Sequence, residues 1–425
     1  MSDALRVRPT APFARVHLLV CTLLLLAGCA TGAAPPAAGE PPPTLLLISL
    51  DGARPDYLGR GETPHLDALA REGVHGWMRP AYPSLTFPNH YTLVTGLRPD
   101  RHGIVHNTMH DAALGDFKLS DRAAVENAAW WNDGEPLWVT AENAGLPTAT
   151  LSWPGSEAPV RGVRPTRWLP FDATRPLDAR VDTVLGWLSE PDATRPRLAT
   201  LYFEHIDSAG HAHGPNAPQV HRALRDIDAA IGRLVAGLRA RGLLERTNIV
   251  VVSDHGMAEV APGHAVAVED MVSMEEARVV SIGQVVGIAP NPGHEDAVAA
   301  RLLGAHAQYD CWRKEALPAR WAYGRHPRVP PIVCQMHEGW DALPREVVAT
   351  REARPRGSHG FDPALESMRA LFVARGPAFR SGVALDGFDN VDVYPLLARL
   401  LGVAPAEHDG DAATLLPALR TDDPR

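Results

Sequence analysis

The sequence predicts an α/β fold: a mostly parallel central sheet covered by helices on both faces, with a small α+β insertion. Several short apolar runs have the unbroken hydrophobicity of strands that are buried on both faces. Stretches with helical periodicity lie between these runs, which is the order expected when helices connect parallel strands. Hydrophobic residues make up 45% and charged residues 21% of the 425-residue chain, which is the balance of a globular protein.

The strands are expected where apolar runs stop at polar residues or glycine. The first run, "TLLLISLDG", ends in Asp-Gly and leaves Asp51 at the carboxyl end of a buried strand. Later runs of the same character lie at 148–153, 198–207, 247–256 and 370–376. Parallel sheets bind their ligands beyond the carboxyl ends of their strands, so the residues that follow these runs are the candidates for function.

Helices are expected at three clear places. The stretch 218–241 has a single apolar stripe, formed by Val220, Leu224, Ile227, Ile231, Leu234 and Leu238. Another helix is expected from Pro88, which suits a first helical position, to Gly96, which ends it. Thr86 then lies at the mouth of this helix, close to backbone N–H groups that have no partner within the helix. A closing helix is expected at 392–403.

The N-terminal region is expected to be a lipoprotein signal peptide, residues 1–28, followed by a Pro/Ala-rich tether at 29–43. Its apolar run is too short to span a bilayer, and "LAGC" resembles a bacterial lipobox in which Cys29 receives the lipid. A cleaved signal with a chance cysteine is the alternative. Ala30 follows Cys29, and the lack of Asp there resembles outer-membrane sorting. We therefore expect an exported protein that is lipid-anchored at the outer membrane and faces the periplasm of a Gram-negative bacterium.

The rest of the chain is expected to form a main domain at 44–280 and 351–425, with an inserted subdomain at 281–350. The insertion contains Cys311 and Cys334. An even pair in an exported protein indicates a disulfide rather than a metal site. The net charge of −9 argues against binding to a nucleic-acid polymer. We expect a monomer that contacts membranes only through its lipid anchor.

Residues that bind metals follow three of the expected strands: Asp51, Asp207, and the adjacent Asp254 and His255. One aspartate after a strand is ordinarily a turn former or a helix cap. Three such endings on one sheet are better explained by carboxylates that converge at its edge. Gly256 permits the turn that lets Asp254 and His255 face one ion.

Further histidines extend this set. In "HIDSAGHAHG" we expect Asp207 and His211 in a Gly-containing loop, where carboxylate and imidazole suit Zn²⁺. His205 and His213 in the same segment compete for this role. His359 lies in the Gly-flanked "GSHGF", where a lone histidine is more often exposed to solvent.

Together these residues suffice for a two-metal phosphoryl-transfer site. Three Asp, three His and Thr86 supply two tetrahedral metal sites, each with a position left for substrate. Two ions roughly 4 Å apart clamp the attacking and leaving oxygens of an in-line displacement at phosphorus. Thr86 supplies the attacking oxygen, and the helix mouth behind it favours a phosphoryl group. Asn107 offers an amide N–H₂ to a phosphoryl oxygen, although taken alone it is an ordinary turn residue.

Seven segments stand in the order found in nucleotide pyrophosphatase/phosphodiesterases, which belong to the alkaline phosphatase superfamily. They are "DGARPDYL", "TPHLDALAREGV", "PSLTFPNHYTLVTGLRPDRHGIVHN", "WPGSE", "HIDSAGHAHG", "SDHGM" and "GSHGFD". The chain resembles this family from about Leu45 to its C-terminus. The resemblance implies an alkaline phosphatase-like α/β/α sandwich that holds two Zn²⁺ ions.

The resemblance also implies a role for each candidate. Asp207, His211 and His359 resemble the ligands of one zinc ion. The residues that resemble the ligands of the other are Asp51, Thr86, Asp254 and His255. Thr86 resembles the nucleophile that forms a phospho-threonine intermediate, and Asn107 resembles the ligand of a phosphate oxygen.

Aromatic rings surround the nucleotide base in this family. Phe87 matches one of them, and Phe171 lies about where a second falls. Core packing explains Phe171 equally well from the sequence. One departure follows His359, where the chain has Gly-Phe-Asp-Pro and the family often has Gly-Tyr-Asp-Asn.

We therefore expect a zinc-dependent phosphodiesterase/pyrophosphatase that cleaves nucleotide phosphodiester or phosphoanhydride bonds and releases nucleoside 5′-monophosphate. One alternative is the same chemistry on glycerophosphodiester or lysophospholipid headgroups. A phosphomonoesterase is disfavoured because no Arg or Lys lies near Thr86 in the sequence to hold a second phosphate charge. The alternative of another class is a non-catalytic zinc- or nucleotide-binding surface lipoprotein, against which the full set of candidate ligands argues.

Overall fold

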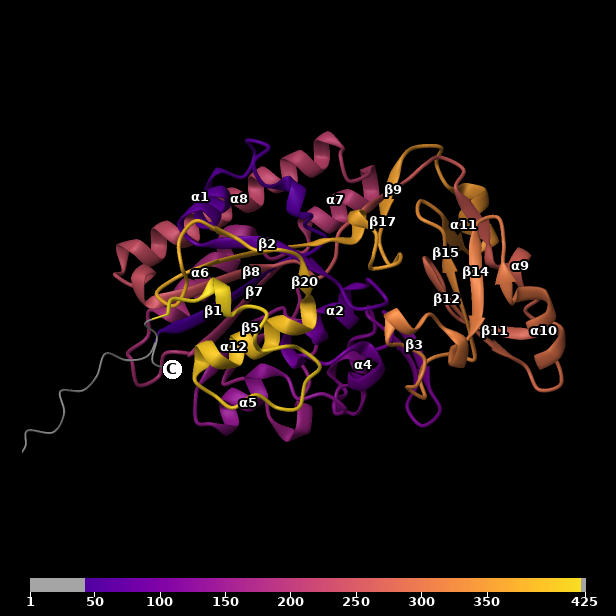
Figure 1. Ribbon diagram of the computed structural model, residues 1–425, viewed down its shortest axis with the longest axis horizontal. Coiled ribbons are helices and arrows are strands. Elements are labelled where there is room, and N and C mark those ends of the chain that lie inside the picture. The colour runs from indigo at the N-terminus through magenta and orange to yellow at the C-terminus, as the bar shows by residue number, and fades with distance from the viewer. Residues whose placement is uncertain (1–42, 422–425) are drawn as a thin grey trace, which may run out of the picture. The chain divides into compact units, whose positions relative to one another are not determined.

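A nine-stranded, mostly parallel sheet forms the centre of the computed structural model, which describes residues 43–421 (Figure 1). The predicted signal peptide, the lipidation site at Cys29 and nearly all of the tether lie outside the described residues. The strands are Thr44–Leu50 (β1), Val74–Arg79 (β2), Thr148–Leu151 (β5), Arg167–Leu169 (β6), Leu198–Phe203 (β7), Thr247–Val252 (β8), Ala370–Arg375 (β18), Val383–Ala384 (β19) and Phe388–Asp389 (β20). Their order is β19-β2-β18-β8-β1-β7-β5-β6, with β20 also beside β2.

Helices cover both faces of this sheet, so the predicted α/β/α architecture is confirmed (Figure 1). The helices on one face are Pro64–Glu72 (α1), Leu177–Leu188 (α6), His205–His213 (α7) and Pro218–Ala240 (α8). Those on the other face are Thr86–Thr95 (α2), Leu137–Asn143 (α5) and Val393–Leu401 (α12), with the short helices Pro99–His102 (α3) and Arg122–Glu126 (α4) nearby. Within 43–421, no helix combines the length and the apolar character that crossing a membrane requires.

The first strand shows how one apolar run serves two cores. Leu45 and Leu47 pack in the core that contains residues of α2, α5 and α12, whereas Leu46 and Ile48 pack in the core of α1, α6 and α8. Successive side chains of a strand point to opposite faces, and all four of these leucine and isoleucine side chains are fully buried. This two-sided burial explains why the sequence shows no polar alternation here.

One strand of the sheet runs against its neighbours. β18 lies antiparallel between β2 and β8, whereas β8, β1, β7, β5 and β6 are parallel to one another. Its apolar run resembles those of the parallel strands, so hydrophobicity does not reveal its direction. The reversal follows from the preceding chain, which passes the carboxyl edge of the sheet before β18 begins there. At that edge the Leu371 N–H donates to the Ala53 carbonyl.

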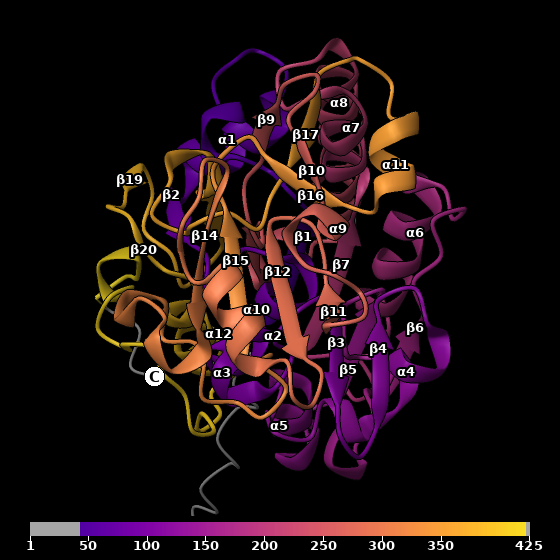
Figure 2. The same ribbon diagram turned by 90° about the vertical axis from the view of Figure 1, so that its right-hand side faces the viewer.

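A second sheet of five antiparallel strands is formed by residues 277–336 (Figure 2). Its strands, in spatial order, are Ala277–Ser281 (β11), Val285–Pro290 (β12), Ile332–Met336 (β15), Tyr309–Arg313 (β14) and Gly304–Ala305 (β13). Helix Glu295–Leu302 (α10) packs against it. Cys311 and Cys334 lie opposite each other in β14 and β15 and form a disulfide.

Short strand pairs and helices connect the two sheets and complete the fold. The strand pairs are Thr108–Asp111 (β3) with Gly115–Lys118 (β4), Ala258–Val260 (β9) with Arg356–Ser358 (β17), and Ala265–Ala267 (β10) with Asp341–Leu343 (β16). The remaining short helices are Val268–Met271 (α9) and Arg345–Thr350 (α11). Of these pieces, β17 matters most for the site, because His359 follows it directly.

Two segments differ from their expected conformations. Helix α2 begins at Thr86, two residues before the expected start, so Pro88 is its third residue. The proline is tolerated because N–H groups of a first turn have no acceptor within the helix. The expected loop that carries Asp207 and His211 is instead helix α7, so that expectation is wrong. Gly210 serves close packing rather than a loop, since a Cβ there would lie 3.0 Å from the Met257 side chain.

Substitution of the glycine that ends α2 tests how closely the end of this helix packs against its neighbours. Gly96 has a φ of 66°, and a Cβ on it would lie 2.8 Å from Tyr394 and His408. Gly145 has a φ of 78° but no atom within 4 Å of a Cβ, so it is the matched control. We expect Gly145→Ala to lower the free energy of unfolding by about 1 kcal/mol through backbone strain. Gly96→Ala should cost about 2 kcal/mol more, because overpacking is added to that strain.

Denaturant titration followed by circular dichroism measures both losses. Equal losses in the two variants would contradict close packing at the end of α2.

Candidate two-metal site

The first cluster of candidate ligands comes from α7 and the residue after β17. Asp207 and His211 lie one helical turn apart on α7. Asp207 Oδ1 lies 3.4 Å from Nε2 of His211 and 3.4 Å from Nε2 of His359. The ligand atoms of the three residues all lie within 4.8 Å of one another, a spacing that one metal ion can bridge. His359 is only 4% exposed, which excludes the solvent-facing interpretation.

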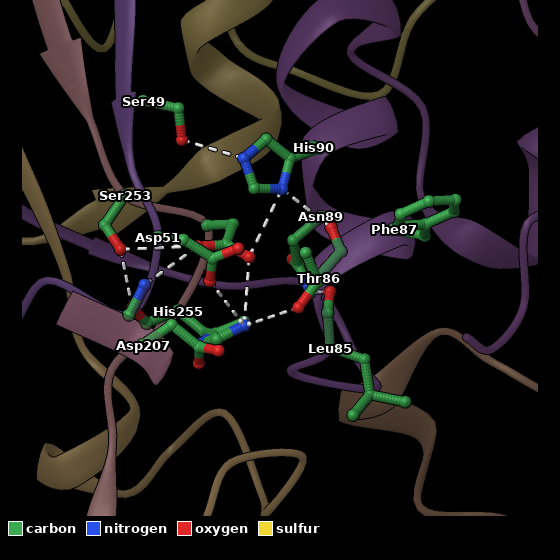
Figure 3. A network of polar contacts seen from close by, with 12 residues as sticks. Ser49, Asp51, Leu85, Thr86, Phe87, Asn89, His90, Asp207, Ser253 and His255 are labelled. Carbon is green, nitrogen blue, oxygen red and sulfur yellow. Dashed lines mark hydrogen bonds and ion pairs between the residues drawn. The ribbon is translucent and has the colours of Figure 1, made fainter. Parts of the chain in front are cut away.

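The second cluster lies at the carboxyl ends of two neighbouring parallel strands. Asp51 follows β1, and Asp254 and His255 follow β8. Nε2 of His255 lies 2.9 Å from Asp254 Oδ2 and 3.5 Å from Asp51 Oδ1. Thr86, the first residue of α2, has its Oγ1 3.3 Å from the same Nε2 (Figure 3). The candidate nucleophile therefore lies against this cluster.

The two clusters adjoin, and their carboxylates lack donors. The rings of His255 and His359 stack with their centroids 3.5 Å apart. Three of the buried carboxylate oxygens that have no hydrogen-bond donor lie here together: Asp51 Oδ1, Asp207 Oδ1 and Asp254 Oδ2. Buried carboxylate oxygens are normally hydrogen-bonded, so three exceptions in one place fit a pair of divalent cations.

The three histidines are oriented as metal ligands by their Nδ1 atoms. Each Nδ1 faces a backbone carbonyl oxygen: His211 with Gly357 at 3.0 Å, His255 with Gly256 at 2.9 Å, and His359 with Ser84 at 3.0 Å. A carbonyl only accepts hydrogen bonds, so Nδ1 carries the proton. In the neutral form of each ring the lone pair is on Nε2, which is the atom that faces the carboxylates in both clusters.

Two residues that sequence reasoning missed support the second cluster. The Tyr202 hydroxyl donates to Asp51 Oδ2 at 2.6 Å. Nδ1 of His90 lies 2.9 Å from the Thr86 carbonyl oxygen and 3.2 Å from Asp254 Oδ2, while Ser49 Oγ lies 2.7 Å from its Nε2 (Figure 3). His90 follows Thr86 by one helical turn, and that spacing is the signal that could have identified it. A hydroxyl near the end of an apolar strand is the corresponding, weaker signal for Tyr202.

The electrostatics of the site are dominated by crowded carboxylates. Burial, and next the charges of Asp254 and Asp207, raise the pKa of Asp51 well above its usual value. Burial also opposes ionisation of Asp254, but His255 and His90 hold its pKa well below the usual range. Burial and the neighbouring histidines lower the pKa of His359, which keeps the ring in the neutral form that binds metals.

Asn107 lies beside the start of α2 in a fixed orientation. Its Oδ1 accepts a hydrogen bond from the Phe87 N–H at 2.9 Å. That bond identifies the oxygen of the amide and leaves the N–H₂ group free to donate. Because Asn107 lines the same pocket as Thr86, this group is available to a ligand next to the candidate nucleophile.

A pocket of about 460 Å³ extends from the two clusters. Phe87 and Phe171 both line it, and Phe171 is 43% exposed, which excludes core packing as its role. Arg122 also lines the pocket, although it is distant from the nucleophile in sequence. Its guanidinium pairs with Glu126 and Glu157, so it is not a free cation for a second phosphate charge.

The competing histidines lie outside both clusters. Nδ1 of His205 is 3.7 Å from a carboxylate oxygen of Glu204, and Nδ1 of His213 is 3.5 Å from Nη1 of Arg354. His213 is two residues from His211 on a helix, a spacing that turns its side chain away from its neighbour's.

Comparison with known proteins gives consistent matches over most of the chain. The sequence model of the family described as type I phosphodiesterase / nucleotide pyrophosphatase matches residues 45–362. An uncharacterized pyrophosphatase/phosphodiesterase of Schizosaccharomyces pombe is 34% identical over 388 residues, which cover 88% of this chain and 80% of that protein. Human ectonucleotide pyrophosphatase/phosphodiesterase family member 7 is 35% identical over 391 residues, which cover 89% and 84% respectively.

The fold is also similar to solved structures. One is an inactive threonine-to-alanine variant of murine ectonucleotide pyrophosphatase/phosphodiesterase 5 in complex with AMP. The similarity has a TM-score of 0.84 at 32% sequence identity, and it covers 89% of this chain and 100% of that chain. The human protein of the same name matches with the same TM-score, 0.84.

Removing the Tyr202 hydroxyl is expected to weaken metal binding without unfolding the protein. Tyr202→Phe deletes the hydrogen bond to Asp51, and loss of such support typically lowers metal affinity by about 10- to 100-fold. Titration of chelator-treated protein with Zn²⁺ against a competing dye measures the change.

Tyr82→Phe is the matched control, because Tyr82 is buried and its hydroxyl has no hydrogen-bond partner. That variant should bind metal as the wild type does. Wild-type affinity in Tyr202→Phe would contradict the supporting role of the hydroxyl.

Proposed function

We propose a two-zinc mechanism with a phospho-threonine intermediate for this chain, which belongs to the type I phosphodiesterase / nucleotide pyrophosphatase family and is an enzyme of that kind. Its substrates are nucleotide phosphodiesters and phosphoanhydrides, and its product is a nucleoside 5′-monophosphate. The observation that carries the proposal is the meeting of two carboxylate–imidazole clusters beside the Thr86 hydroxyl.

The donor atoms of the two clusters suit zinc. One ion is assigned to Asp207, His211 and His359, and the ligands assigned to the other are Asp51, Thr86, Asp254 and His255. Carboxylate oxygens and neutral Nε2 atoms are preferred zinc ligands, and three carboxylate oxygens without donors support this assignment. When bound, the two ions neutralise charge on the phosphoryl oxygens and make a nearby hydroxyl more acidic.

Residues at the start of α2 perform the displacement. Thr86 Oγ1 attacks phosphorus, the bond from phosphorus to the leaving oxygen breaks, and water then hydrolyses the phospho-threonine. The positive end of the α2 dipole lies at Thr86 and favours the charged phosphoryl group, although the Phe87 N–H is bonded to Asn107 and Pro88 has no N–H. The Asn107 N–H₂ group donates to one of its oxygens. His90 contacts the Thr86 carbonyl and so holds the first turn in place.

Phe87 and Phe171 stack on the base of the substrate. Both rings line the pocket that begins at Thr86, and base–aromatic stacking tolerates any base. The AMP complex of the murine relative supports a nucleotide site, and the inactivity of its threonine-to-alanine variant supports a threonine nucleophile.

A substrate panel on zinc-loaded protein separates the remaining alternatives. We expect ATP and dinucleotides to be hydrolysed faster than glycerophosphocholine, whereas the reverse order would favour a headgroup substrate.

Membership of an enzyme family leaves the non-catalytic lipoprotein without support. The relatives named as ectoenzymes support export of this chain. We propose in addition lipidation at Cys29, a monomeric state and the division into a catalytic domain with an insertion at 281–350.

Replacing the nucleophile is expected to stop turnover and leave the metal bound. Thr86→Ala should lower the rate on p-nitrophenyl thymidine 5′-monophosphate by about 10³-fold or more, because the attacking oxygen is gone. Zinc content by atomic absorption should match the wild type, since the Asp and His ligands remain. Thr86→Ser is the control variant, since it retains a hydroxyl and should retain part of the activity. An unchanged rate in Thr86→Ala would refute the assignment.

Removing the Phe171 ring is expected to weaken nucleotide binding. A stacked aromatic ring contributes about 1–3 kcal/mol per base, so Phe171→Ala should raise the KM for p-nitrophenyl thymidine 5′-monophosphate about tenfold. Steady-state kinetics on this substrate and on bis(p-nitrophenyl) phosphate, which has no base, measure the difference. Phe171→Tyr keeps the ring and should keep the KM. Equal effects of Phe171→Ala on both substrates would contradict stacking.

A further inference from the structure

An ion pair lines the pocket together with the two aromatic rings. Arg122, the first residue of α4, is the one Lys or Arg among the described residues that line the pocket. Its Nη2 donates to Glu126 at 2.9 Å and pairs with a carboxylate oxygen of Glu157. The Arg122 side chain is 48% exposed, whereas that of Glu157 is 4% exposed. The guanidinium is therefore the member of the pair that a ligand reaches.

Glu157 contacts both this guanidinium and the backbone of Phe171. Its second carboxylate oxygen, Oε1, accepts a hydrogen bond from the Phe171 N–H at 3.0 Å. The Ser152 hydroxyl donates to the carbonyl of the preceding Pro170 at 3.3 Å, so the backbone is held on both sides of the Phe171 N–H. One buried carboxylate thus fixes the position of an exposed ring and of a cation together.

The charged pair offers a ligand in the pocket only hydrogen-bond donors. Both carboxylate oxygens of Glu157 are engaged, one by Phe171 and the other by Arg122. Arg122 has five N–H groups, and its contacts with Glu126 and Glu157 both use Nη2. The carboxylates raise the pKa of Arg122, so it remains a donor at all working pH values. Ser120, which also lines the pocket, can donate or accept and so does not discriminate.

Arg122 is poorly suited to bind phosphate. Two carboxylates already neutralise its charge, and the phosphoryl group is assigned to the Thr86 hydroxyl. The residues around Arg122 in the pocket are instead Leu119, Val125 and the Phe171 ring, which suit the flat body of a base. A base stacked there presents its polar edge to the guanidinium.

We propose that Arg122 reads the edge of the base by donating a hydrogen bond to a carbonyl oxygen, with Glu157 as its positioning residue. The inference rests on the proposed nucleotide specificity of the site. The enzyme should then prefer 6-oxopurines and 4-oxopyrimidines, such as hypoxanthine, guanine, uracil and thymine. Adenine and cytosine carry an amino group at the same position, where a donor would meet a donor.

Substrate pairs that differ in this one group test the proposal. ITP and ATP differ at the purine 6-position, and UTP and CTP differ at the pyrimidine 4-position. We expect kcat/KM of the zinc-loaded wild type to be about tenfold higher for ITP than for ATP, and for UTP than for CTP. Arg122→Ala should bring both ratios close to one, mainly by losing activity on ITP and UTP. Rates are normalised to hydrolysis of bis(p-nitrophenyl) phosphate by the same protein.

Two further variants separate base reading from general damage. Glu157→Gln keeps an acceptor for the Phe171 N–H but removes the charge that orients Arg122, so both ratios should fall while Phe171 stays in place. Arg233→Ala is the matched control: this arginine is 47% exposed and pairs with Asp182 between α8 and α6, outside the pocket. It should leave both ratios unchanged. Wild-type ratios of one, or ratios unaffected by Arg122→Ala, would overturn the proposal.

A binding measurement makes the inference independent of turnover. Calorimetric titration of Thr86→Ala with IMP and with AMP should give tighter binding of IMP, and the additional Arg122→Ala change should remove the difference. Hydrolysis without an oxo preference would refute the reading of the base and leave the proposed function intact. A preference for IMP without hydrolysis by the wild type would refute the proposed function and leave this inference intact.

Discussion

Crowding of three carboxylates at one edge of the sheet is the constraint on which the rest of the structure depends. Asp51, Asp207 and Asp254 each bury an oxygen that has no hydrogen-bond donor. Burial, and next the charges of Asp254 and Asp207, raise the pKa of Asp51, and carboxylates so placed are costly to bury unless cations compensate for them. The adjacent histidines supply part of this compensation, and the proposed pair of metal ions would supply the rest. The surrounding fold keeps the three groups from moving apart.

The strongest restraint on this geometry is backbone packing around the His359 segment. A Cβ on Gly357 would lie 2.5 Å from the Gly210 carbonyl oxygen, so α7 and β17 approach each other as closely as glycine permits. The segment is also tied on both sides: Gln335 of the second sheet donates to the Gly360 carbonyl at 3.3 Å, and Ser84 donates to the Phe361 carbonyl at 2.9 Å. The second sheet therefore helps to hold a candidate metal ligand beside α7.

The sequence predicts the features that depend on local pattern. Buried strands appear as apolar runs, and their polar endings identify Asp51, Asp254 and His255 at a shared edge. The direction of β18 and the helix at 205–213 are not predicted, because direction leaves no hydrophobic signal and Gly210 is as compatible with close packing as with a loop. The roles of Tyr202 and Arg122 are not predicted from the sequence for a different reason. Their partners lie 151 and 35 residues away, and only the folded chain brings them together.

The placement of β18 has a consequence for folding during synthesis and for truncation of the C-terminus. This strand occupies the middle of the sheet although it comes from the last seventh of the chain, and it separates β2 from β8. Until it is inserted, both neighbours present unpaired edges to other chains, and such edges promote aggregation. His359 precedes β18 by only eleven residues. Truncation before residue 359 therefore removes β18 together with this candidate metal ligand, so the fragment exposes two unpaired strand edges and keeps only one complete ligand cluster.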